Sequence, residues 1–202
     1  MISAIVLAAG ESKRMGKSKL LLKWQGKIIL KHVLDNLLNS RVDEVILVLG
    51  PEADRILKRV PAEKIKIVIN PDYKEGMSAS IRQGLRAVDE KAKAFLIVLG
   101  DQPGISKEVL DRLITDFQRI HPKKKIVLPT YRGSRGHPVL FSVKYLKEAL
   151  RLKGDVGCRQ ILMDHPEDIL AIEMDTDAVL NDIDTPEDYR ERLKRKFPRE
   201  RK

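Results

Sequence analysis

The feature that most constrains this chain is the alternation of short apolar runs with helical patterns. The runs are rich in β-branched residues and lie at residues 2–7, 44–49, 65–69, 95–99 and 126–128. Several of them lack alternating polar side chains, which is typical of strands in a parallel sheet covered on both faces. Helical stripes occupy residues 29–37 and 109–117. The pattern predicts an α/β fold with an open, mostly parallel sheet and helices on both faces.

In such a sheet, ligands bind beyond the carboxyl ends of the strands, so function is sought in the loops that follow them. Three of these loops begin after Leu7, Ile69 and Leu99. Residues 131–184 are less regular, and we expect them to form a sheet edge and a wall of the binding site. Since the chain shows no internal repeat or linker, we predict one domain over residues 1–189 and a basic helix end and tail over residues 190–202.

The net charge of +10 suggests nucleic-acid binding as one function class. Eight basic and two acidic side chains in residues 190–202, however, account for +6 of that charge. Aromatic residues, on which bases would stack, make up only 4% of the chain. We therefore expect no nucleic-acid partner; the alternative predicts salt-dependent binding that is lost when the tail is removed.

The single cysteine, Cys158, excludes an internal disulfide and is typical of a reducing cytoplasm. No apolar run reaches the roughly 18–20 residues that span a bilayer. The apolar start lacks a preceding basic segment and is followed at once by charged residues, which favours a buried strand over a signal peptide. We expect a cytoplasmic protein with no membrane partner.

The loop after the first apolar run combines two glycines with several cations. Five residues separate Gly10 from Gly16, whereas a P-loop requires four between these glycines. The chain also lacks the G-x-G-x-x-G dinucleotide fingerprint. Backbone amides together with Arg14 and Lys19 suit a triphosphate. A plain strand-to-helix turn with solvated charges is the alternative interpretation.

Residues 7–22, LAAGESKRMGKSKLLL, closely resemble the signature L-x-x-G-x-S-x-R-M-G-x-x-K of the MobA-like nucleotidyltransferases, above all their molybdenum cofactor cytidylyltransferase branch. This resemblance implies a Rossmann-like nucleotidyltransferase fold and transfer of a nucleoside monophosphate from an NTP to a phosphorylated acceptor. It implies backbone contacts to the nucleotide at the start of the segment and two cations on the triphosphate. The positions concerned are Leu7, Ala8, Ala9, Gly10, Arg14 and Lys19.

Residues 76–85, GMSASIRQGL, form a second block, which is similar to the S-[VI]-x-x-G-L element of cytidylyltransferases. From the residues alone, Ser78 is a candidate N-cap of a helix. The resemblance places a serine near the helix start against the base, which points first to Ser80 and second to Ser78. Asn70 and Asp72, in the preceding loop, are further candidates for the ribose or the acceptor.

Two acidic segments indicate a magnesium site. Asp101 directly follows an apolar run, where an Asp is often only a turn residue, but it matches the family's G-D-x-P metal motif. Residues 181–188, NDIDTPED, are similar to the family's D-[IV]-D-T-P-E-D, and Thr185 followed by proline indicates a helix start. The resemblance implies that Asp101 and Asp184 hold Mg²⁺, which needs few carboxylates beside phosphate oxygens. Asp182 is assigned a structural role behind the ligands.

Residues 131–141, YRGSRGHPVLF, resemble the family's G-x-x-G-[NH]-P-V-L-F element. Arg132, Arg135 and His137 are thereby candidates for binding the acceptor's phosphate, and a β-hairpin with solvated arginines is the alternative. Residues 154–159, GDVGCR, are similar to the G-D-x-G-x-R of the branch, so Asp155 and Arg159 are expected to order the acceptor loop; a helix start is the alternative explanation of both residues.

The resemblance implies transfer of CMP from CTP to molybdopterin, with Arg14, Lys19 and Asp101 as catalytic residues and Mg²⁺ as cofactor. A molybdenum hydroxylase is the expected recipient of the product. The alternatives are a guanylyltransferase, a cytidylyltransferase with a sugar-phosphate acceptor, and a non-catalytic chaperone of the cofactor. Ala9 favours cytosine, because the guanylyl branch more often has two glycines there.

Overall fold

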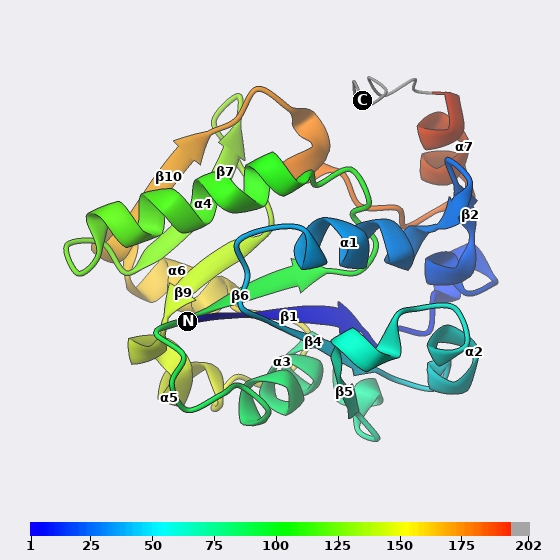
Figure 1. Cartoon of the computed structure of the whole chain (residues 1–202), viewed down its shortest axis with the longest axis horizontal. Coiled ribbons are helices and arrows are strands. Elements are labelled where there is room, and N and C mark those ends of the chain that lie inside the picture. The colour runs from blue at the N-terminus through cyan, green and yellow to red at the C-terminus, as the bar shows by residue number, and fades with distance from the viewer. Residues whose placement is uncertain (195–202) are drawn as a thin grey trace.

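The computed structural model describes residues 1–194 and contains an eight-stranded sheet in the order β10-β7-β9-β6-β1-β4-β5, with β8 paired to β7 (Figure 1). The strands are β1 (Ile2–Ala8), β4 (Glu44–Leu49), β5 (Lys66–Ile69), β6 (Ala94–Leu99), β7 (Ile126–Tyr131), β8 (Ser134–Arg135), β9 (Val139–Ser142) and β10 (Ile169–Glu173). A separate two-stranded sheet pairs β2 (Lys23–Trp24) with β3 (Lys27–Ile28).

The pairing of the strands confirms the predicted open, mostly parallel sheet. Strand β1 lies between β4 and β6 and is parallel to both, while β4 pairs in parallel with β5 and β7 with β10. Strand β9 is antiparallel to both of its neighbours. Each predicted apolar run corresponds to an observed strand. The less regular region supplies β8, β9 and β10, and β10 forms the expected edge.

Helices cover both faces of the sheet (Figure 1). They are α1 (Ile29–Leu38), α2 (Ala53–Leu57), α3 (Met77–Arg86), α4 (Lys107–Ile120), α5 (Leu146–Ala149), α6 (Arg159–Asp164) and α7 (Pro186–Lys194). Along β1, Ala4 and Val6 pack in a core with α1 and α4, whereas Ile5 packs in a second core with α3. Because alternate residues of a strand face opposite layers, both sets must be apolar, which explains the uninterrupted run.

Helix α3 packs very closely on β1. A Cβ atom added at Gly84 would lie 2.3 Å from Cγ2 of Ile5 and 3.1 Å from Cγ2 of Val48. Only a glycine permits this approach without repacking. Since α3 follows β5 after a short loop, its first turn lies at the carboxyl edge of the sheet.

The last described helix begins as predicted. The backbone N–H of Asp188 donates to Oγ1 of Thr185 at 3.1 Å, and the N–H of Thr185 donates to Oδ2 of Asp188 at 2.7 Å. This reciprocal capping holds the segment before α7 in place. Of the predicted basic tail, residues 190–194 belong to α7, and residues 195–202 lie outside the described part of the chain. Within residues 1–194, no helix has the length and apolar character needed to cross a bilayer.

Candidate active site

Three carboxylates meet at the carboxyl edge of the sheet. Asp101 follows β6, while Asp182 and Asp184 precede α7, and one oxygen from each lies within 4.8 Å of the others. The two segments are joined by a hydrogen bond from the backbone N–H of Ile183 to the carbonyl oxygen of Asp101 at 3.1 Å. This bond brings together residues that lie far apart in the sequence.

Asp182 lies within this cluster, whereas the sequence placed it behind the ligands. Ile183 is fully buried between the two aspartates and anchors the segment. Side chains at alternate positions of an extended segment point the same way, so Asp182 and Asp184 both face Asp101. The structure therefore presents three carboxylates where the sequence analysis expected two.

Two cations neutralise part of this charge. The ammonium group of Lys19 pairs with Oδ2 of Asp101 and lies 2.7 Å from Oδ1 of Asp184. The guanidinium of Arg14 lies 2.6 Å from Oδ2 of Asp184. The side chain of Lys19 is only 15% exposed, whereas that of Arg14 is 70% exposed. Lys19 is thus the inner cation, and Arg14 extends from the cluster into solvent.

The charges at the site shift the pKa values of its ionisable side chains in different directions. Burial lowers the pKa of Lys19, but the carboxylates of Asp101 and Asp184 outweigh that effect and raise it. Burial raises the pKa of Asp184, and its bonds to Lys19 and Arg14 bring it below the usual value. At Asp182, whose side chain remains exposed on one side, partial desolvation and the charges of Asp184 and Asp101 act together and raise the pKa. Lys19 and Asp184 are therefore held charged, while Asp182 carries the repulsion of its neighbours.

The donor set fits a hard divalent cation. Mg²⁺ binds oxygen ligands and uses one or a few carboxylates together with substrate phosphates. Oδ1 of Asp101 is buried and has no hydrogen-bond partner among the described residues, so its lone pairs are available to a ligand. A buried carboxylate oxygen without a partner is costly unless something binds it. Asp101, Asp182 and Asp184 are the residues that would hold the ion.

Two adjoining cavities open beside the carboxylates. A cavity of about 300 Å³ is lined by the end of β1, the start of α3 and the acidic cluster; its lining includes Leu7, Ala8, Ala9, Gly10, Ser80 and Asp101. A cavity of about 560 Å³ adjoins it and is lined by Glu11, Ser12, Lys13, Lys74, Glu75 and several residues shared with the first. Arg14, Lys19 and Asp184 line both cavities. The cations and carboxylates therefore lie between a partly apolar pocket and a polar cleft.

The loop after β1 folds over this boundary without adopting a P-loop. It contains two short 3-10 helices, Lys13–Met15 and Lys19–Leu21, and Gly16 between them has φ of 68°. The backbone N–H of Lys19 donates to Oγ of Ser12 at 3.2 Å, which closes the loop. Below it, a Cβ atom at Gly50 would lie 2.4 Å from the carbonyl oxygen of Ala9. Gly50, which follows β4, therefore lets the loop after β1 pack directly against the carboxyl edge of the sheet.

The two candidate serines of α3 differ in whether they reach a cavity. The helix begins at Met77 with Gly76 as N-cap, so Ser78 is inside the first turn and the predicted cap is wrong. Ser78 is fully buried and lines neither cavity. Ser80 lines the smaller cavity and accepts a hydrogen bond from Nδ2 of Asn70 at 3.0 Å. Of the two, Ser80 alone is placed to meet a nucleotide in that cavity.

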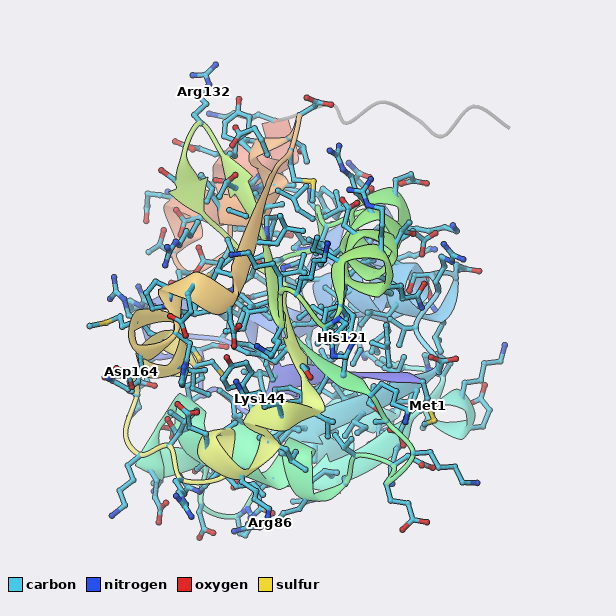
Figure 2. All side chains as sticks on the ribbon, turned by 90° about the vertical axis from the view of Figure 1, so that its left-hand side faces the viewer. Met1, Arg86, His121, Arg132, Lys144 and Asp164 are labelled. Carbon is cyan, nitrogen blue, oxygen red and sulfur yellow. The ribbon has the colours of Figure 1, made fainter. Side chains whose placement is uncertain are left out.

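The predicted acceptor residues lie farther away. Arg132 and Arg135 are exposed on the hairpin of β7 and β8, and Arg132 extends from its tip (Figure 2). Neither arginine lines the two cavities. His137 is half-buried, and its backbone N–H donates to the carbonyl oxygen of Val179 at 2.9 Å. Burial lowers the pKa of His137, and the charge of Asp182 opposes this shift.

Two lining residues stand out beyond those assigned to the nucleotide. Tyr73 lines both cavities and follows β5, at the carboxyl edge of the sheet where ligands of such folds bind. Asp155 also lines both, and its Oδ1 accepts a hydrogen bond from the backbone N–H of Met77 at 2.9 Å. The residue expected to order an acceptor loop therefore also caps α3.

Cations facing a carboxylate cluster at the carboxyl edge of an α/β sheet are the arrangement of a nucleotidyltransferase. A family model described as MobA-like NTP transferase domain matches residues 4–169, and the chain belongs to this family. The resemblance found in the sequence is thereby confirmed.

Two relatives cover nearly the whole chain. The molybdenum cofactor cytidylyltransferase of Escherichia coli (strain K12) is 30% identical over an alignment of 193 residues, and the match covers 93% of each chain. The nicotine blue oxidoreductase of Paenarthrobacter nicotinovorans is 31% identical over an alignment of 192 residues, and the match covers 92% of this chain and 93% of that protein. This chain is thus about equally similar to two relatives whose names denote different activities.

Solved structures show the same fold. Rv0371c from Mycobacterium tuberculosis H37Rv superposes with a TM-score of 0.86 at 31% identity, covering 96% of this chain and 97% of that one. A complex of Rv0371C with manganese gives a TM-score of 0.79 at 29% identity, over 95% and 97% of the two chains.

Proposed function

We propose that this nucleotidyltransferase moves CMP from CTP to the phosphate of a molybdopterin-type cofactor, with Mg²⁺, and releases pyrophosphate. The observation that carries the proposal is the placement of Lys19 and Arg14. Both contact Asp184, and both line the two cavities beside the carboxylates. An anionic ligand and a metal ion would share this boundary. The similarity to a molybdenum cofactor cytidylyltransferase supports the choice of substrates.

The reaction would consist of an in-line displacement at the α-phosphorus of CTP. An oxygen of the acceptor's phosphate forms the new P–O bond, and the bond between the α-phosphorus and the bridging oxygen breaks as pyrophosphate leaves. The attacking oxygen is already ionised, so no general base is required. Lys19 and Arg14 would bind the β- and γ-phosphates and stabilise the charge that develops on the leaving group.

The carboxylates have a complementary role. Asp101, Asp182 and Asp184 would hold Mg²⁺, which supplies positive charge to the phosphate oxygens when it is bound. Leu7, Ala8 and Ala9 offer an apolar wall for the base in the smaller cavity, next to the hydroxyl of Ser80. Positioning of two anionic substrates and neutralisation of their charge would account for most of the catalysis.

On the acceptor side, we propose that Arg132, Arg135 and His137 contribute from the β7–β8 hairpin and its continuation. The charge of Asp182 acts on the ring of His137, which links this histidine to the carboxylate cluster. The two arginines would meet an acceptor that extends beyond the cavities. A molybdenum hydroxylase would receive the product.

The test combines the protein with Mg²⁺, molybdopterin and CTP or GTP, and measures pyrophosphate and the dinucleotide product. We expect turnover with CTP that Asp101→Asn abolishes, whereas Asp116→Asn, in α4 and outside both cavities, leaves it intact. Equal turnover with GTP would contradict the cytidylyl assignment. Tight binding of molybdopterin without pyrophosphate release would favour the chaperone alternative.

A further inference from the structure

Asn70 lies immediately after β5 and behind the smaller cavity. It is 1% exposed and lines neither cavity, although the sequence suggested it as a ligand of the ribose or acceptor. Its backbone N–H donates to the carbonyl oxygen of Leu49 at 2.8 Å, which extends the sheet by one hydrogen bond. Any role of its side chain in recognition must therefore pass through a neighbour.

The hydrogen bonds of Asn70 fix the orientation of its amide. The backbone N–H of Asp72, which can only donate, lies 3.0 Å from one end of the amide, so this end is the oxygen Oδ1. The other end is then Nδ2, which can only donate, and it lies 3.0 Å from Oγ of Ser80. Ser80 must therefore act as the acceptor in this pair.

The proton of the Ser80 hydroxyl is left for another acceptor. Among the hydrogen bonds of residues 1–194, Ser80 accepts from Asn70 and donates to no protein atom. The residue is 6% exposed, and it lines the smaller cavity next to Met77 and Ala9. One of the two lone pairs of Oγ is engaged by Asn70, and the Ser80 proton, which Asn70 cannot accept, is available to an acceptor in that cavity.

We propose that Asn70 is a positioning residue that makes Ser80 a hydrogen-bond donor to the nucleobase, and thereby selects for the acceptor atoms of cytosine. This inference rests on the proposed function. Cytosine offers acceptors at O2 and N3, whereas guanine carries donors at N1 and N2 on the corresponding edge. An acceptor atom of cytosine satisfies the Ser80 proton, whereas a donor of guanine would use the second lone pair of Ser80 and leave this proton without an acceptor.

Asn70→Asp reverses the polarity of the pair with little change in shape. Both carboxylate oxygens can only accept, one from Asp72 and the other from the Ser80 hydroxyl. Ser80 then turns a lone pair toward the cavity, against the acceptor of the base. We expect CTP affinity, measured by calorimetry with Mg²⁺, to fall by roughly tenfold or more, and GTP affinity to hold or rise, because the donors of guanine then meet an acceptor.

Ser80→Ala removes the donor without introducing a repulsive lone pair. We expect a loss of roughly 3–10-fold for CTP, smaller than that of Asn70→Asp. Because Asn70 acts through Ser80, Asn70→Asp should cause no further loss of CTP selectivity once Ser80 is alanine. A purely structural role of Asn70 would instead reduce binding of both nucleotides by the same factor in either background.

Two variants serve as matched controls. Asn36→Asp replaces an amide that donates to the carbonyl oxygen of Ile105 at 2.7 Å, and Ser142→Ala removes a buried hydroxyl that accepts from the N–H of Lys144. Neither lies at the cavities, so both should retain the CTP-to-GTP preference. If the wild type binds CTP and Asn70→Asp keeps the same CTP-to-GTP preference, the inference is overturned and the proposed function still stands. Absence of CTP binding by the wild type overturns both.

Discussion

Replacing Lys19 with methionine removes the ammonium group from the carboxylate cluster while retaining most of the side-chain volume. In the structure this ammonium contacts Asp101 and Asp184, and their side chains are 15% and 23% exposed. A hydrogen bond to a charged group contributes about 1.5–3 kcal/mol, and partial exposure reduces this through screening. Without a metal ion, we expect Lys19→Met to lower the free energy of unfolding by about 2–4 kcal/mol.

The same substitution should strengthen metal binding in the absence of nucleotide. In the wild type a divalent ion must displace the ammonium from the two carboxylates, and each 1.4 kcal/mol of that cost weakens binding about tenfold. We therefore expect Lys19→Met to bind Mn²⁺ at least about tenfold more tightly, as measured by the electron paramagnetic resonance signal of free Mn²⁺. Saturating Mn²⁺ should also recover much of the lost stability in urea unfolding, because it binds the folded state.

Lys17→Met is the matched control, because Lys17 is an exposed lysine in the same loop. It should change neither the stability nor the Mn²⁺ affinity. Turnover should nevertheless fall in Lys19→Met, since the triphosphate loses a cation. Equal Mn²⁺ affinity in Lys19→Met and the wild type would refute the reasoning, because it would mean that Lys19 does not compete for the metal's ligands.

Three further predictions concern other parts of the molecule. Gly84→Ala should destabilise the protein by about 1–3 kcal/mol in urea unfolding despite a better helix propensity, because the added Cβ would lie 2.3 Å from a carbon of Ile5; unchanged stability would contradict the close packing. The lowered pKa of Asp184 means that its stabilisation is complete above the ordinary value of 3.8 and is lost as pH falls through the lower folded-state pKa. Asp184→Asn should therefore flatten the acid dependence of metal-free unfolding, and a profile identical to that of the wild type would contradict this. Arg132→Ala should raise the KM for the acceptor severalfold and leave CTP affinity unchanged, and an unaltered acceptor KM in steady-state assays would exclude the hairpin from acceptor binding.

Strands and their loops were predictable because the signals for them are local. A strand buried on both faces must be apolar, and β6 is apolar at all six positions and β4 at every position after Glu44. The position of Asp101 followed from the same reasoning, since only Gly100 separates it from the end of β6. The shape of the cavities was not predictable, because their walls combine loops from distant parts of the chain.

The start of α3 shows where local reasoning fails. Ser78 is a good N-cap by type, but Gly76 takes φ of 97° and the helix begins one residue before the serine. The N–H of Met77 is satisfied by Asp155, 78 positions away, and that of Ser78 by the carbonyl oxygen of Gly154 at 3.1 Å. A cap supplied by a distant loop leaves no trace in the sequence around the helix.

Asp182 represents the opposite case, because its position could have been deduced. In the order Asp-Ile-Asp, a buried Ile183 forces both aspartates to the other side of an extended segment, and Asp184 was already expected to face Asp101. The consequence for charge is direct. Three carboxylates meet one inner cation, Lys19, and one largely exposed cation, Arg14, so the cluster stays negative at its centre and the pKa of Asp182 rises. A divalent ion held by all three would remove that repulsion and free both cations for a triphosphate, which is why metal and nucleotide should bind this site cooperatively.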